Sequence, residues 1–147
     1  MAVDVIMHPG AVVILPIVSP GEVLLLRQYR PSVRRWLWEL PAGTLERGET
    51  SLACAKREII EETGFAATDW RKLAGFFSAP GFCTERLVLY AARNLRPATG
   101  DLDADENLRV VRLTRARVET LIRSGRIVDA KTLVGLLLWL GGRVPAN

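Results

Sequence analysis

Hydrophobic residues gather in short runs near the start of the chain, and these runs predict β-strands. AVVILPIV (11–18) and EVLLLRQY (22–29) are rich in apolar residues and are separated by SPG (19–21). Two such runs joined by a short turn predict a β-hairpin. WLWEL (36–40) predicts a third strand, whereas the Pro and Gly residues of PAGTLERGET (41–50) predict a loop.

After this loop the pattern changes to the spacing of a helix. Leu52, Ala55, Ile59 and Ile60 recur three and four positions apart between residues 51 and 63, and Thr50 or Ser51 can cap the first turn. Later runs predict strands at 72–79, 86–95 and 108–114 and helices at 114–125 and 129–142.

The order of these elements is strands, helix, strands, helices. It predicts an α/β protein in which a mixed β-sheet carries helices on its faces. The last helix is expected to begin after Asp129, a capping residue, and to stop near Gly141. DLDADE (101–106) is expected to be a short solvated acidic loop.

Composition narrows the class of protein. The 147 residues suit one domain, taken as 1–147, and 49% hydrophobic residues with 24% charged residues are typical of a globular chain. The net charge of +4 can steer anionic ligands such as nucleotides, but the Arg residues are dispersed and no nucleic-acid-binding motif occurs. We therefore expect no nucleic-acid partner.

Cysteine use and hydropathy indicate the compartment. Cys54 and Cys83 form neither a disulfide framework nor a metal-type spacing, which favours a reducing, cytoplasmic setting. The first residues carry no signal-peptide pattern, and LVGLLLWL (133–140) is far shorter than the roughly 18–20 residues that span a bilayer. We expect no membrane partner.

The segment REIIEETG (57–64) raises a question of charge. In a helix that ends at Gly64, Glu58, Glu61 and Glu62 lie on neighbouring parts of one face. They are also close to the C-terminal, negative end of the helix dipole. Like charges at this spacing cost roughly 0.2–0.5 kcal/mol per pair. A divalent cation would offset that cost, since Mg²⁺ takes oxygen ligands. The alternative is a solvated acidic patch in which Arg57 pairs with Glu61.

The residues around this segment favour a cation site over a solvated acidic patch. GTLERGETSLACAKREIIEETGF (43–65) fits the pattern G-x5-E-x7-R-E-U-x-E-E-x-G-U at its fixed positions, with Phe65 in the place of the last aliphatic residue. In this the chain resembles the Nudix hydrolase family. The resemblance implies a Nudix-type α/β/α sandwich with a mixed sheet and a loop-helix-loop metal site. It also implies hydrolysis of a nucleoside diphosphate linked to another group.

The resemblance also implies roles for individual residues. Two or more Mg²⁺ or Mn²⁺ ions are expected on Glu58, Glu61, Glu62, Glu49 and the carbonyl of Ala42. Arg57 is expected to orient the carboxylates by ion pairing, and Glu61 to take part in catalysis. Gly43 and Gly64 are expected to permit the turns at either end of the motif.

Residues outside the motif suggest a branch of the family. FFSAPGFCTE (76–85), RQYRP (27–31) and the closing DAKTLVGLLLWL (129–140) resemble ADP-ribose pyrophosphatases. The resemblance makes Glu85 the candidate general base or an added metal ligand. Candidate contacts to the nucleotide substrate are Arg27, Arg30, Pro80, Gly81 and Phe82.

Several alternatives stay open at this point. The substrate could be another nucleoside diphosphate sugar, a dinucleotide or an oxidised nucleoside triphosphate, or the domain could bind nucleotides without turnover. Trp36, Trp38 and Phe82 could stack on a base, although packing is the commoner role of tryptophan. His8 is the single histidine and supports no catalytic triad. Only ten residues precede Ala11, so a homodimer and adenosine recognition through a preceding segment are left open.

Overall fold

The computed structural model describes residues 3–98 and 108–144, so the expected acidic loop 101–106 lies outside the described residues. In chain order the elements are β1 (Ala11–Ser19), β2 (Glu22–Arg30), β3 (Arg35–Glu39), β4 (Ala42–Thr44), α1 (Ser51–Thr63), β5 (Phe65–Phe77), β6 (Arg86–Pro97), β7 (Leu108–Thr114), α2 (Arg115–Arg123) and α3 (Ala130–Leu140).

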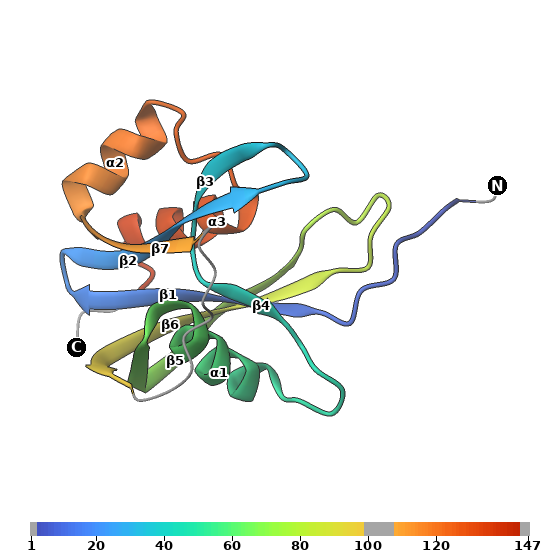
Figure 1. Ribbon diagram of the computed structural model, residues 1–147, viewed down its shortest axis with the longest axis horizontal. Helices are drawn as coiled ribbons and strands as arrows, with labels where there is room; N and C mark the ends of the chain where they lie inside the picture. The colour runs from blue at the N-terminus through green and yellow to red at the C-terminus, as the bar shows by residue number, and fades with distance from the viewer. Residues whose placement is uncertain (1–2, 99–107, 145–147) are drawn as a thin grey trace.

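The strands form one mixed sheet (Figure 1). Its order is β3-β2-β1-β6-β5, with β4 paired to β1 and β7 paired to β2. β1 and β6 run parallel, whereas the other pairs are antiparallel. The predicted hairpin of β1 and β2 is confirmed. Ser19 pairs with Glu22, which leaves Pro20 and Gly21 as the turn.

β1 lies at the centre of the sheet and is apolar along its length because both of its faces are buried. Val13 and Leu15 belong to one hydrophobic cluster, and Val12 and Ile14 belong to another. A strand covered on both faces has no polar face to show, which explains the continuous apolar run in the sequence.

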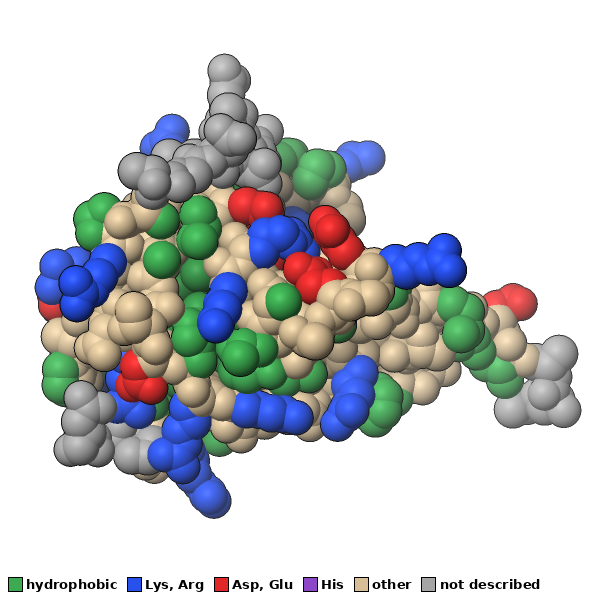
Figure 2. All heavy atoms as spheres, turned by 90° about the horizontal axis from the view of Figure 1, so that it is seen from below, with side chains coloured by type: hydrophobic (Ala, Val, Ile, Leu, Met, Phe, Trp, Pro, Cys, Tyr) green, Lys and Arg blue, Asp and Glu red, His purple; other side chains and the backbone are tan. Residues whose placement is uncertain are grey.

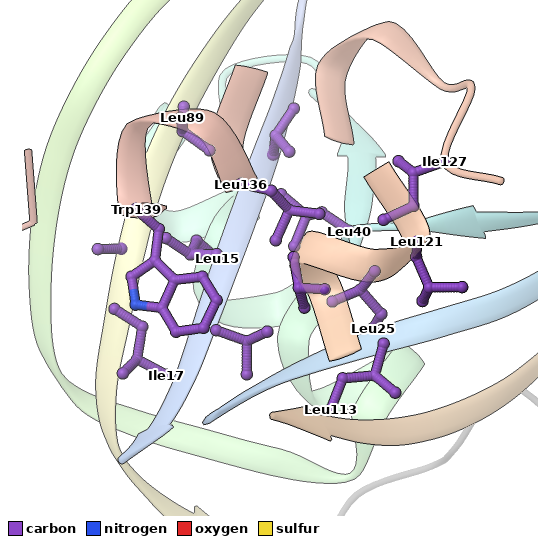
Figure 3. Close-up of a cluster of buried hydrophobic side chains, with 14 of the residues drawn as sticks. Leu15, Ile17, Leu25, Leu40, Leu89, Leu113, Leu121, Ile127, Leu136 and Trp139 are labelled. Carbon is purple, nitrogen blue, oxygen red and sulfur yellow. The ribbon is translucent and has the colours of Figure 1, made fainter. Parts of the chain in front are cut away.

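Helices cover both faces of the sheet. Figure 3 shows the larger cluster, in which Leu121 of α2 and Leu136 and Trp139 of α3 pack against strand residues such as Leu15 and Leu25. On the opposite face Cys54, Ala55 and Ile59 of α1 complete the second cluster. The α/β/α sandwich expected from the sequence is confirmed.

Two strands differ from the expectation. Residues 42–44 form β4, inside the segment predicted as a loop, because pairing with β1 outweighs the breaker residues around it. β5 begins at Phe65 instead of residue 72 and ends at Phe77, since its pairing with β6 continues past the polar residues that hid it. No helix in the described part of the chain is both long and apolar enough to cross a bilayer.

Candidate active site

The carboxylates of the motif lie on a helix with well-defined ends. Thr50 caps α1 by accepting a hydrogen bond from the amide of Ala53. Gly64 ends it in the left-handed conformation, with φ of 74°, and donates its amide hydrogen to the carbonyl of Ile60. Glycine adopts this conformation without steric cost, so the helix stops where the sequence predicts.

Arg57 lies at the centre of three carboxylates. Its guanidinium donates to Glu49 at 3.0 Å through both Nε and Nη2, and Nη1 donates to Glu58 at 2.8 Å and to Glu61 at 3.0 Å. The hydrogen bonds from Arg57 lower the pKa of Glu49 to about 2. In Figure 2, which views the molecule from the α1 side, acidic and basic side chains lie together near the middle of the face.

Gly43 brings β4 into direct contact with the helix. A Cβ at this position would lie 1.9 Å from the carboxyl carbon of Glu58, closer than any side chain allows. The glycine therefore lets the Glu58 carboxylate rest against the backbone of β4. This packing explains the requirement for glycine at a position that the sequence assigned only to a turn.

Glu62 has a different environment from its neighbours. Its carboxylate accepts a hydrogen bond from the amide of Ala42 at 2.9 Å. Loss of water around the carboxyl group raises its pKa to about 8, and the nearby charge of Glu58 acts in the same direction. The amide of Ala42 lowers the pKa without reversing the shift. Without a cation, this glutamate is mostly protonated at neutral pH.

The metal ligands expected from the sequence are not gathered as a finished cage. Among residues 3–98 and 108–144, no three His, Cys, Asp or Glu side chains form a group ready to hold an ion. Glu49, Glu58 and Glu61 are instead turned toward Arg57, and Glu62 toward Ala42. The donor set still fits a hard divalent cation, because the carboxylates of Glu58 and Glu62 both lie against β4 and that of Glu62 is partly desolvated.

A cavity of about 410 Å³ opens beside β4. Its wall includes Ala42 and Gly43 of β4, Arg30 at the end of β2, and Lys131 in the first turn of α3. Glu85, at the end of the β5–β6 loop, also lines it. The cavity thus adjoins the helix carboxylates through β4 and meets cationic groups on another side.

The other predicted substrate residues lie elsewhere. Arg27 packs over the ring of Trp38, 4.8 Å from its centroid, and donates to the carbonyl of Trp36. Pro80, Gly81 and Phe82 lie in the β5–β6 loop, away from the cavity wall, and Phe82 is 56% exposed. Of the proposed substrate contacts, only Arg30 lines this cavity.

A charge network that the sequence did not suggest orients the cations of the cavity. Glu39 is 1% exposed and accepts two hydrogen bonds of 2.7 Å from Arg30 and one of 3.0 Å from Lys131. Lys131 also contacts Asp129, at 2.9 Å, and Asp129 caps α3 as predicted. Burial would raise the pKa of Glu39, but the hydrogen bond from Arg30 and the charge of Lys131 bring it below the ordinary value.

Sequence reasoning missed Glu39 and Lys131 because they lie 92 positions apart. The available signal was the glutamate itself. Glu39 directly precedes a buried leucine at the end of an apolar strand, and a charge at such a position needs partners. The sequence could not indicate which cation would supply them.

Comparisons with known proteins show what the chain as a whole resembles. The model of the NUDIX domain matches residues 7–132. The chain is 35% identical over 131 residues to "ADP-ribose pyrophosphatase" of Bacillus subtilis (strain 168), covering 88% of this chain and 71% of the relative. It is 34% identical over 135 residues to "Methanol dehydrogenase activator" of Bacillus methanolicus, covering 90% and 73%.

A solved structure described as "ADP compounds hydrolase" has the same fold. Its TM-score to this chain is 0.82 at 28% sequence identity, and the match covers 93% of this chain and 75% of that one.

Proposed function

The chain belongs to the NUDIX domain family, and from this premise we propose that it hydrolyses ADP-ribose to AMP and ribose 5-phosphate. Its class as a pyrophosphatase hydrolase follows from the family model together with the relatives described above. The observation that carries the substrate proposal is the cavity that adjoins the helix carboxylates and is lined by Arg30, Lys131 and Glu85.

The chemical demands of a pyrophosphate match these groups. Its anionic oxygens need cations, and the Arg30 guanidinium and Lys131 ammonium are held toward one cavity by Glu39. Because Glu39 is buried and ionised, both cations keep a fixed position before substrate arrives. Such preorganisation is the main contribution a protein makes to phosphoryl transfer.

Divalent ions, Mg²⁺ or Mn²⁺, are part of the proposal. Glu58, Glu61 and Glu62 would hold them, with the Ala42 carbonyl and Glu49 as further oxygen ligands. When bound, such ions neutralise phosphate charge and lower the pKa of bound water. For the carboxylates to become ligands, Glu62 must give up its proton, and Glu58 and Glu61 must turn away from Arg57.

Glu85 is proposed as the general base. Glu85 lines the cavity, and a carboxylate there can accept the proton of a bound water. The water oxygen forms a bond to one phosphorus, the bond from that phosphorus to the bridging oxygen breaks, and Glu85 takes the water's proton. The bridging oxygen leaves with the other phosphate.

The setting and assembly of the enzyme complete the proposal. The two free cysteines support a location in the reducing cytoplasm. Exposed apolar residues in the N-terminal segment, including Ile6 at 59% and Met7 at 79%, support a homodimer. Light scattering on a sizing column tests the dimer, which a monomer mass at assay concentration would refute.

A product-resolved assay tests the function. The enzyme is incubated with Mg²⁺ or Mn²⁺ and with ADP-ribose, a UDP-sugar, a GDP-sugar, NADH, a diadenosine polyphosphate or an oxidised nucleoside triphosphate. We expect AMP and ribose 5-phosphate from ADP-ribose at the highest kcat/KM. Faster turnover of another compound would refute ADP-ribose as the substrate. Nucleotide binding with no turnover in Mg²⁺ and none in Mn²⁺ would refute the proposal that the protein is an enzyme.

A further inference from the structure

The N-terminal segment before β1 is bound to the loop that carries Glu85. Both extend from the same end of the molecule in Figure 1, and Ile6 pairs with Cys83 in a parallel bridge. The amide of Ile6 donates to the Phe82 carbonyl at 2.8 Å, and the Thr84 amide donates to the Ile6 carbonyl at 3.0 Å. The segment therefore follows the loop residue by residue up to Glu85.

His8 extends this contact to the side chains. Its backbone amide donates to the hydroxyl of Thr84 at 2.9 Å. Its ring nitrogen Nε2 lies 3.6 Å from Oε1 of Glu85, and the two side chains are 25% and 26% exposed. This separation is slightly longer than a hydrogen bond, so a small rotation of either side chain closes it.

A second hydrogen bond determines which ring nitrogen carries the proton. The amide of Gly10 donates to Nδ1 of His8 at 3.0 Å, so Nδ1 must be an acceptor. The neutral ring then carries its hydrogen on Nε2, the nitrogen that faces Glu85. A neighbouring amide thus directs the imidazole donor toward the carboxylate on the cavity wall.

The backbone of Glu85 is restrained, but its carboxylate has few partners. Its carbonyl accepts from the amide of Ser78 at 3.2 Å, and its amide contacts the sulfur of Cys83 at 3.4 Å. Within the described residues, His8 is the one cationic or imidazole side chain within ion-pair distance of the Glu85 carboxylate.

We propose that His8 is a positioning residue that orients the Glu85 carboxylate to accept the proton of the attacking water. The proposal rests on the function proposed above. His8 itself does not touch the reacting atoms. Since backbone bonds at Ile6 and Thr84 already attach the segment to the loop, the ring serves orientation more than folding.

Three substitutions at one position separate this role from a structural one. The substitutions are His8→Asn, His8→Gln and His8→Ala. His8→Asn places an oxygen where Nδ1 lies, which can accept a hydrogen bond from the Gly10 amide, but its side chain does not reach Glu85. Gln places an amide donor near the position of Nε2. Ala provides neither group. The comparison uses the full chain, with kcat, KM and the melting temperature measured for each variant.

We expect His8→Ala and His8→Asn to lower kcat about tenfold, since a misplaced catalytic group costs rate more than affinity. KM and the melting temperature stay near wild type, and His8→Gln recovers most of kcat. Unchanged kcat in His8→Ala, or an equal loss in all three variants, would overturn the proposal.

A double variant tests whether His8 acts through Glu85. In a Glu85→Gln background, we expect His8→Ala to cause no further loss of kcat. A full additional loss would overturn the proposal. If Glu85→Gln alone keeps full kcat, Glu85 is not the general base, and the positioning role of His8 fails with that assignment. The series uses whichever nucleotide the enzyme turns over fastest, so an error in the substrate does not affect it.

Spectroscopy gives a readout that does not depend on activity. The chain has one histidine, so its ring nitrogens are unambiguous in a long-range ¹H–¹⁵N NMR spectrum. We expect the hydrogen on Nε2 and a change in the Nε2 shift in Glu85→Gln. A neutral ring with its hydrogen on Nδ1, or an Nε2 shift unaffected by Glu85→Gln, would overturn the proposal.

Discussion

Two glutamates near the same cavity respond to their surroundings in opposite ways. Glu39 is fully buried and its pKa is lowered, whereas Glu62 is half-buried and its pKa is raised to about 8. Glu39 contacts two cations, Arg30 and Lys131. Glu62 instead accepts a hydrogen bond from the neutral amide of Ala42.

The difference shows that partners, more than burial, decide whether a carboxylate is charged. Burial disfavours the charge of both glutamates, and the direct hydrogen bonds from two cations reverse that effect at Glu39. The protein supplies these cations to Glu39, which then orders one side of the cavity. Arg30 also lowers the pKa of Glu62, but by less than the loss of water raises it.

The largest effect is expected from removing a carboxylate on α1. Glu58→Gln or Glu62→Gln should lower kcat at least about 100-fold and leave the fold intact, because charge neutralisation of the phosphate is lost. Turnover and circular dichroism measure the two effects. Glu119→Gln on α2 is the control and should keep wild-type kcat. Near-normal activity in both α1 variants would contradict the metal site.

Glu39→Ala should also lower the stability of the fold. Removing the buried partner of Arg30 and Lys131 should cost about 3 kcal/mol, the low end for a broken buried pair because Arg30 is partly solvated. Urea unfolding measures this loss. Glu22→Gln, which breaks the exposed pair with Arg112, is the matched control and should change stability much less. Equal losses of stability in Glu39→Ala and Glu22→Gln would show that the buried ion pair contributes no more than the exposed one.

Lys131→Ala should weaken substrate binding more than folding. Loss of one charged contact to a phosphate should raise KM about tenfold, corresponding to about 1.4 kcal/mol. Lys131→Arg should recover part of the affinity, since it keeps the charge. Steady-state kinetics measures both variants, and an unchanged KM in Lys131→Ala would place the substrate elsewhere.

The smallest effect concerns the proton on Glu62. Its pKa is about 8 in the folded, metal-free protein against an ordinary value of 4.5, so folding retains a proton that the unfolded chain loses. The contribution of Glu62 to stability is therefore full below pH 4.5 and declines as the pH rises toward 8. Binding of a divalent ion at pH 7 should release about one proton from this site.

Calorimetry of Mg²⁺ binding in two buffers of different ionisation enthalpy measures that release. The apparent affinity for Mg²⁺ should rise with pH up to about 8, and Glu62→Gln should abolish this part of the rise. Proton release that persists in Glu62→Gln would assign the proton to another group.

Local patterns were sufficient for much of the fold. The caps at Thr50 and Asp129 and the stop at Gly64 are where the sequence placed them, because capping depends on residues within one turn. β4 was missed because three residues beside Pro41 become a strand only through pairing with β1. The start of β5 was missed for the same reason, since its partner β6 lies beyond a loop.

The sequence by itself determined the family, the α/β/α class and the glutamates that share a face of α1, because the spacing of nearby residues sets each of these. Only the tertiary structure decided that Glu39 would contact Lys131 and that His8 would lie beside Glu85. These contacts join residues far apart in the chain. No local spacing encodes them, since they arise only when the sheet and its loops bring distant segments together.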